Sequence, residues 1–187
     1  MRCFIAVEIE PALRHSVWEL TAPLRAVDAE IRWVAERNFH LTIKFLGETP
    51  SGAIDGISRA LENSLVGLTE FDLAFRGCGA FPNLRNPHVV WVGLVGFGRL
   101  MAIQSAVEPA MVKMGFRPEE RAFSPHLTIG RVKGPRGMIA MADEIAKLRS
   151  LEFGACRVRG VALMQSELSP TGPTYTRLLE APLAGLE

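Results

Sequence analysis

The sequence has few cysteines and no segment long enough to cross a membrane. Its three cysteines, Cys3, Cys78 and Cys156, lie far apart and form no C-x-x-C pair. This odd, scattered set predicts neither a disulfide framework nor a zinc site. No apolar run approaches the length of a membrane-spanning helix, and the N-terminal segment turns acidic at Glu8, too early for a secretory signal. We therefore expect a protein of the reducing cytoplasm with no membrane association.

The chain also lacks an excess of charge of either sign. With 21 Lys and Arg against 20 Asp and Glu, its net charge is +1, which excludes a globally basic nucleic-acid binder but allows a local basic patch. Apolar residues make up 48% of the 187 residues and charged residues 22%, as is usual for a globular protein. This length is enough to bury a core, so we expect residues 1–187 to form a single domain.

The most informative feature is a tetrapeptide, His-Leu-Thr-Ile, that occurs at residues 40–43 and again at 126–129. Each copy lies in an apolar run bounded by glycine or proline, which predicts a strand. Side chains alternate between the two faces of a strand, so the histidine and threonine of each copy share one face. The leucine and isoleucine would anchor the core, and the polar pair would line a cleft.

Apolar periodicity predicts helices interleaved with strands along the rest of the chain. Helical spacing covers residues 11–24, 54–65, 100–114 and 138–148, and Pro109 should kink or shorten the third of these helices. The expected strands are residues 3–9, 31–45 as one run, 71–75, 89–94, 126–129, 153–168 as one long stretch, and 175–179, with a loop at 169–173.

Each His-Leu-Thr-Ile strand follows a helix, which indicates an internal pseudo-repeat. The pattern favours an α+β class with a duplicated, two-lobed fold. In it, two antiparallel sheets would face a central cleft, with the helices on the outside and one motif strand from each lobe.

The four motif side chains, His40, Thr42, His126 and Thr128, suit acid-base chemistry. One such histidine in a strand would be most simply a structural, hydrogen-bonded residue. A core does not need the same polar pair at two distant positions, whereas a symmetric acid-base site does, and histidine titrates near neutrality. No Asp, Glu or Cys accompanies the histidines on their strand faces, so we expect no metal and no cofactor. A nucleophilic threonine would lack a third, orienting residue.

In-line displacement at phosphorus uses these groups directly. It needs a base on one side of the phosphate, an acid on the other, and neutral donors to the non-bridging oxygens. Two imidazoles meet the first need, and the hydroxyls of Thr42 and Thr128 meet the second as substrate-binding groups. A 2′,3′-cyclic phosphate at an RNA end is a natural target, because its strained ring opens with one proton taken from water and one given to a ribose oxygen.

The sequence resembles the two-histidine (2H) phosphoesterase superfamily, and within it most closely the RNA 2′,3′-cyclic phosphodiesterases, also called 2′-5′ RNA ligases. Nearly the whole chain takes part. The matching segments are Met1–Ala6, Trp33–Val34, Asn38–Glu48, Phe81–Pro82, Val89–Gly93, Arg117–Glu119, Phe123–Arg131, Ser166–Leu168 and Gly172–Tyr175. A single H-x-T-x would be weak evidence, but two in this setting are specific.

The resemblance implies the duplicated α+β fold and assigns the two histidines different roles. His40 would be the proton donor and His126 the proton acceptor when a cyclic phosphate is hydrolysed to a 2′-phosphomonoester. Ligation through a 2′-5′ linkage would be the reverse reaction. The implied partner is RNA with a 2′,3′-cyclic phosphate end, such as tRNA fragments or short oligonucleotides, and we expect a monomer without an obligatory protein partner.

Several other polar residues stay outside the expected catalytic set. Lys44 shares the strand parity of the first polar pair and could face the phosphate, whereas Phe45 by parity belongs to the core. Arg131 has the opposite strand parity to His126. Its side chain would point to the same face as His126 only at a strand end or through a bulge. His88 stands where many relatives carry arginine, and is either an exposed loop residue or a titratable replacement in RNA binding. His15 is expected to be solvated or capping.

Two other functions fit the sequence. One is a non-catalytic module that binds RNA ends. The other is a phosphodiesterase for a small cyclic nucleotide or an ADP-ribose cyclic phosphate. Turnover of a cyclic-phosphate oligonucleotide separates the first from catalysis, and the dependence of the rate on substrate length separates the second.

Overall fold

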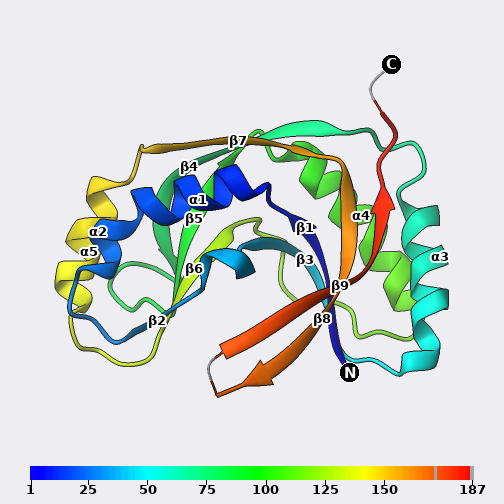
Figure 1. Cartoon of the computed structure of the whole chain (residues 1–187), viewed down its shortest axis with the longest axis horizontal. Coiled ribbons are helices and arrows are strands. Elements are labelled where there is room, and N and C mark those ends of the chain that lie inside the picture. Colours follow the sequence, from blue (N-terminus) through cyan, green and yellow to red (C-terminus); the bar gives the residue numbers. More distant parts are fainter. Residues whose placement is uncertain (171, 186–187) are drawn as a thin grey trace.

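The protein is built around two antiparallel sheets with helices outside them (Figure 1). The computed structural model describes residues 1–170 and 172–185. Sheet A has four strands in the order β3-β1-β8-β9, and sheet B has five in the order β2-β6-β5-β4-β7. Helices α3 and α4 pack together at one end of the molecule, and α1, α2 and α5 lie at the other (Figure 1). The expected α+β class is confirmed.

The bounds of the elements follow. Sheet A contains β1 (Arg2–Glu8), β3 (His40–Glu48), β8 (Gly160–Ser169) and β9 (Gly172–Pro182). Sheet B contains β2 (Ile31–Trp33), β4 (Phe71–Phe81), β5 (Val89–Val95), β6 (Leu127–Val132) and β7 (Glu152–Val158). The helices are α1 (Pro11–Leu20), α2 (Ala22–Arg25), α3 (Ile54–Ser64), α4 (Gly98–Lys113) and α5 (Met138–Lys147), with short 3₁₀ turns η1 (Glu36–Asn38) and η2 (Ser51–Ala53).

The helix expected over residues 11–24 is interrupted at Thr21. Pro23 has no N–H to donate to the carbonyl of Glu19 and so cannot continue the hydrogen-bond ladder. The Thr21 hydroxyl and backbone N–H both donate to the carbonyl of Val17, at 2.7 and 3.1 Å. Proline has less effect in α4, which runs through Pro109 to Lys113 and is not shortened.

The single strand expected over residues 31–45 is divided into β2 of sheet B and β3 of sheet A, with η1 between them. The single long strand expected over residues 153–168 is also wrong. The segment forms two strands in different sheets, because β7 pairs with β4 and β8 pairs with β1. The chain crosses between the sheets at Gly160, where a Cβ would lie 2.8 Å from the carbonyl oxygen of Ala181. The loop expected at 169–173 is also shorter: Ser169 already pairs with Gly172 in the β8–β9 hairpin, which projects from the body (Figure 1). Thr171 lies outside the described residues.

Strand β1 is buried on both of its faces. Cys3, Ile5 and Val7 belong to the main core, which also takes in the apolar faces of the helices. Phe4 and Ala6 point the other way, into a small second cluster with Ala162, Met164 and, at its margin, Tyr175. Sheet A therefore has an aromatic second face. No helix in the described part of the chain is both long and apolar enough to span a bilayer.

Candidate active site

The two motif strands lie beside each other where the sheets meet. Strand β3 forms an edge of sheet A, and it contacts β6 of sheet B (Figure 1). In both copies the leucine and isoleucine are buried and the histidine and threonine are half-buried, so the expected alternation within each motif is confirmed. We call the surface that carries His40, Thr42, His126 and Thr128 the motif face.

Each motif strand has a bulge at its isoleucine. Along β1 and β3, Ala6 pairs with Thr42 and Ile5 with Lys44, which passes over residue 43. Along β5 and β6, Trp91 pairs with Thr128 and Val90 with Gly130, which passes over residue 129. A bulge adds one residue to one strand and so reverses the alternation of the side chains that follow it. Both strands therefore present different residues after the motif than simple parity predicts.

The bulge in β3 overturns the expectations for Lys44 and Phe45. Phe45 is 61% exposed, and its ring centroid lies 6.2 Å from that of Phe4 on the motif face. Lys44 points the other way, with a side chain only 2% exposed. It faces α4 and is no candidate for a phosphate contact.

The Lys44 ammonium group forms a buried ion pair. Its Nζ donates to both carboxylate oxygens of Glu108 in α4, at 2.8 Å each, and to the carbonyl of Arg117 at 2.9 Å. Glu108 also accepts a hydrogen bond from the backbone N–H of Glu119 at 2.9 Å. These contacts hold the segment at Arg117–Glu119, which precedes the second motif, against β3, the strand that carries the first motif.

The bulge in β6 turns Arg131 onto the motif face, as a bulge was expected to do. Its positive charge lowers the pKa of His40, of His126 and of Tyr175, so the guanidinium lies close to both motifs. Within the described residues, Arg131 has no ion pair and no hydrogen bond from its side chain.

The two imidazoles are held in the same way. Nδ1 of His40 lies 2.7 Å from the carbonyl oxygen of Asn38, and Nδ1 of His126 lies 2.7 Å from that of Ser124. A carbonyl can only accept, so each ring donates its Nδ1–H. In each neutral ring Nε2 then holds the free lone pair, and this atom is the one able to exchange a proton with a substrate.

The surroundings of the two rings differ at Nε2. Nε2 of His40 lies 3.1 Å from Oγ1 of Thr42, while Nε2 of His126 has no hydrogen-bond partner in residues 1–170 and 172–185. The His40 ring lies 4.8 Å from Phe4 and packs edge-on against Tyr175 at 5.1 Å. The motifs are identical in sequence, yet only His126 has an open Nε2.

Burial lowers the pKa of both histidines. It outweighs the hydrogen bonds to the carbonyls of Asn38 and Ser124, which favour the protonated rings, and the charge of Arg131 lowers both pKa values further. Both imidazoles are therefore neutral at neutral pH in the free protein.

Asn38 and Tyr175 are site residues that the sequence did not single out. The Asn38 amide donates to the carbonyl of Pro173 at 2.8 Å, so this residue links β9 to the backbone that orients His40. Burial raises the pKa of Tyr175, which keeps its hydroxyl neutral. The position of Asn38, two residues before the histidine as Ser124 is in the second copy, was the available signal.

The remaining histidines are not on the motif strands. His15 is mostly exposed and lies 3.5 Å from Glu36, as expected for a solvated residue. His88 is exposed just before β5, and its role in RNA binding stays a prediction. In the described ranges, no three His, Cys, Asp or Glu side chains gather closely enough to hold a metal ion.

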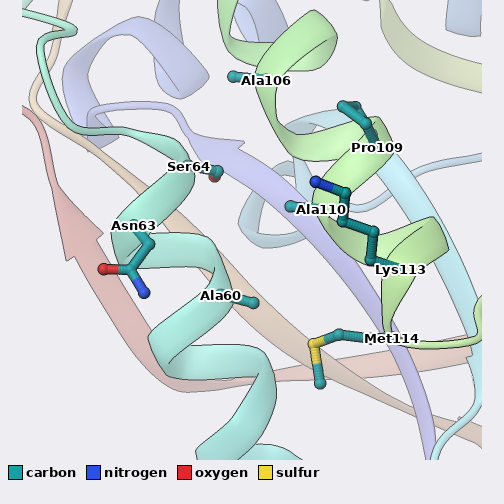
Figure 2. A pocket seen from close by; sticks show the side chains of 8 residues that line it. All are labelled: Ala60, Asn63, Ser64, Ala106, Pro109, Ala110, Lys113 and Met114. Carbon is teal, nitrogen blue, oxygen red and sulfur yellow. The ribbon is translucent and has the colours of Figure 1, made fainter.

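An open groove of about 370 Å³ lies between α3 and α4, and none of its lining residues belongs to a motif strand (Figure 2). Its lining residues are Ala60, Asn63, Ser64, Ala106, Pro109, Ala110, Lys113 and Met114. Lys113 is the one ionisable side chain among them, so the groove offers no acid-base pair, and we place the candidate site on the motif face.

Two antiparallel sheets that each present a His/Thr pair define the two-lobed fold of the 2H phosphoesterases. Residues 12–170 match the family described as the 2′-5′ RNA ligase superfamily. The chain is 40% identical over 176 residues to an RNA 2′,3′-cyclic phosphodiesterase of Methanothermobacter thermautotrophicus, covering 94% of this chain and 95% of the relative. A protein of the same name from Archaeoglobus fulgidus is 38% identical over 178 residues, which cover 95% of this chain and 98% of the relative.

Solved structures agree with this assignment. The crystal structure of TT0787 of Thermus thermophilus superposes with a TM-score of 0.83 at 27% identity and covers 100% of both chains. Escherichia coli LigT complexed with 3′-AMP gives a TM-score of 0.77 at 23% identity over 97% of both chains, a likeness of fold. The chain therefore belongs to the 2′-5′ RNA ligase superfamily, and the resemblance inferred from the motifs is confirmed.

Proposed function

We propose that this protein hydrolyses the 2′,3′-cyclic phosphate at RNA ends to a 2′-phosphomonoester, with His40 and His126 as the acid-base pair and no metal ion. The observation that carries the proposal is the matched anchoring of the two rings. Each donates Nδ1–H to a backbone carbonyl, so Nε2 is the atom that each ring can use for proton transfer, and Nε2 of His40 contacts the Thr42 hydroxyl in the free protein. The names of the curated relatives support the same substrate class.

The state of each Nε2 supports the proposed assignment of proton donor and proton acceptor. Nε2 of His126, which has no partner in the described residues, accepts a proton from the attacking water as the water oxygen bonds to phosphorus. Protonated His40 donates its Nε2 proton to O3′ as the bond between phosphorus and O3′ breaks. In the free protein the lowered pKa keeps His40 neutral. The bound cyclic phosphate is an anion, and it raises the pKa of His40 and so supplies the acid when substrate is present.

The hydroxyls and Arg131 act on the phosphate oxygens. Thr42 and Thr128 donate to the non-bridging oxygens, and the unpaired guanidinium of Arg131 stabilises the charge that builds up on them. Ligation through a 2′-5′ linkage is not the reverse of this hydrolysis, because the 5′-hydroxyl of a second RNA takes the place of water. His126 accepts the hydroxyl proton as O5′ bonds to phosphorus, and His40 again donates to O3′ as the bond between phosphorus and O3′ breaks.

The test is hydrolysis of an oligonucleotide with a 2′,3′-cyclic phosphate end in the presence of EDTA, with the product identified by ³¹P NMR. Substituting His40→Gln or His126→Gln should lower kcat by about 10²–10⁴-fold, the usual contribution of a general acid or base. Circular dichroism checks that each variant is folded. Full activity in either variant, or loss of wild-type activity in EDTA, contradicts the mechanism. Binding without any product would instead indicate a non-catalytic RNA-end module.

A further inference from the structure

Arg32 in β2 lies directly opposite Arg131 in β6 (Figure 1 shows the two strands). The register pairs Ile31 with Val132, Arg32 with Arg131, and Trp33 with Gly130. Residues directly opposite in an antiparallel pair point to the same face, with Cβ atoms about 4.5–5.5 Å apart. Arg32 therefore stands beside Arg131.

The neighbours of Arg32 confirm the direction of its side chain. Ile31 and Trp33 pack on the core side, where a Cβ on Gly130 would lie 2.8 Å from Ile31 and 2.9 Å from Trp33. Side chains alternate along β2, so Arg32 points away from the core, and it is exposed. It thus projects on the same side as Arg131, onto the motif face.

These two arginines are cross-strand neighbours of like charge, and no protein group in the described residues neutralises either of them. Within residues 1–170 and 172–185, neither guanidinium has an ion pair or a side-chain hydrogen bond. Some other arginines are paired with acids, such as Arg136 with Asp28 and Arg159 with Glu10, whereas no acid in the described residues lies between Arg32 and Arg131 to offset their repulsion. Like charges placed directly opposite each other on a sheet are destabilising. An anion bound between them would relieve that repulsion.

We propose that Arg32 and Arg131 form a second phosphate subsite, in which Arg32 binds the phosphodiester that joins the terminal nucleotide to the one before it. This inference rests on the proposed function, because Arg131 also serves the reacting phosphate. β2 is the edge strand of sheet B, so Arg32 lies one strand farther out than Arg131. The subsite therefore extends the substrate along the RNA chain, and the preferred substrate is an oligonucleotide of at least two nucleotides.

The experiment compares two substrates and two variants. Cytidine 2′,3′-cyclic phosphate has no internal phosphate, whereas the dinucleotide ApC with a 2′,3′-cyclic end has one. Arg32→Gln should lower kcat/KM for the dinucleotide about tenfold, which is the size of one charge-assisted hydrogen bond, and leave the mononucleotide unchanged. Arg59→Gln is the matched control, because Arg59 is exposed on α3 and has no partner in the described residues. It should change neither substrate.

A third substrate identifies the group that Arg32 recognises. A dinucleotide with a neutral methylphosphonate in place of the internal phosphodiester should be a poorer substrate for the wild type by the same factor. Arg32→Gln should then cause no additional loss, since the two changes remove the same interaction.

The outcomes separate this inference from the proposed function. If the wild-type protein hydrolyses none of the substrates, the proposed function is contradicted. The subsite is then tested by comparing the dissociation constants of the same substrates and variants. Turnover with an equal loss on both substrates in Arg32→Gln overturns the subsite alone. The subsite is also overturned if the wild type has the same kcat/KM for the methylphosphonate and the phosphodiester. It is likewise overturned if Arg59→Gln lowers kcat/KM for the dinucleotide as much as Arg32→Gln does.

Discussion

The buried ion pair between Lys44 and Glu108 gives the sharpest prediction, since the sequence and the structure assign Lys44 opposite roles. Lys44→Met keeps the length of the side chain and removes its charge. Glu108, whose side chain is 20% exposed, then loses its cation while keeping the hydrogen bond from the Glu119 N–H. Removing one member of a buried pair costs about 3–5 kcal/mol. Partial exposure of the carboxylate places the expected loss in the free energy of unfolding at the lower end, about 3 kcal/mol.

The assay is a double-mutant cycle followed by urea and thermal unfolding. At about 2–4 °C per kcal/mol for a domain of this size, Lys44→Met should lower Tm by about 6–12 °C. Glu108→Leu should also destabilise, because it leaves the ammonium group buried without its carboxylate. The double variant should be more stable than the sum of the single losses predicts, since it leaves no unpaired charge.

The kinetic readout distinguishes the two roles of Lys44. Its side chain points to Glu108 in α4 and away from the motif face, so the KM of folded Lys44→Met for a cyclic phosphate should stay within about twofold of wild type. A variant with unchanged stability and a KM raised tenfold or more would mean that Lys44 faces the phosphate. That result would contradict the bulge at Ile43, which turns Lys44 away from the motif face.

Three further predictions concern the motif face. Arg131 lowers the pKa of both histidines, so Arg131→Gln should shift the whole profile of kcat/KM against pH to higher pH. The same variant should lower the maximum of the profile. A profile that stays at the same pH would contradict this prediction. Because both folded-state pKa values lie below the usual value of about 6.5, the unfolded chain binds more protons, and the free energy of unfolding should fall as pH drops below about 6.5. Urea unfolding at pH 7.5 and 5 should show a smaller fall in the His40→Gln/His126→Gln variant. Asn38→Ala should lower the free energy of unfolding by about 1 kcal/mol and should also lower kcat. Asn38→Asp cannot donate to the Pro173 carbonyl and should have the same effects. A wild-type kcat in both variants would contradict the linking role of Asn38.

The alternation within the motifs was predictable because it depends only on local strand geometry. The leucines and isoleucines are buried and the His/Thr pairs share a face, as a period of two requires. The orientation of residues after the motif was not predictable. Ile43 and Ile129 are β-branched apolar residues that fit a regular strand, and the bulges exist only relative to neighbouring β1 and β5. A register between strands distant in sequence leaves no local signal.

The error at residues 153–168 has the same origin. The segment reads as uninterrupted strand, and only the partners, β4 for one half and β1 for the other, reveal that it changes sheet. Gly160 was a weak local sign of the crossing, since glycine in a strand also marks ordinary bulges. Local pattern therefore predicted which residues are extended, and tertiary pairing decided which sheet they join.

The bulges also explain how two identical tetrapeptides make an asymmetric site. Each motif is followed by two residues that differ, Lys44-Phe45 in one copy and Gly130-Arg131 in the other. Because both strands bulge at the isoleucine, the second residue of each pair turns onto the motif face. These residues are an exposed aromatic ring from β3 and, from β6, a guanidinium that has no partner among the described residues. A nucleotide is apolar at its base and anionic at its phosphates, so such a surface favours one orientation of the substrate over the reverse. Phe45 and Arg131, two residues after each motif, therefore add a second difference between the copies to the one at Nε2 of the histidines.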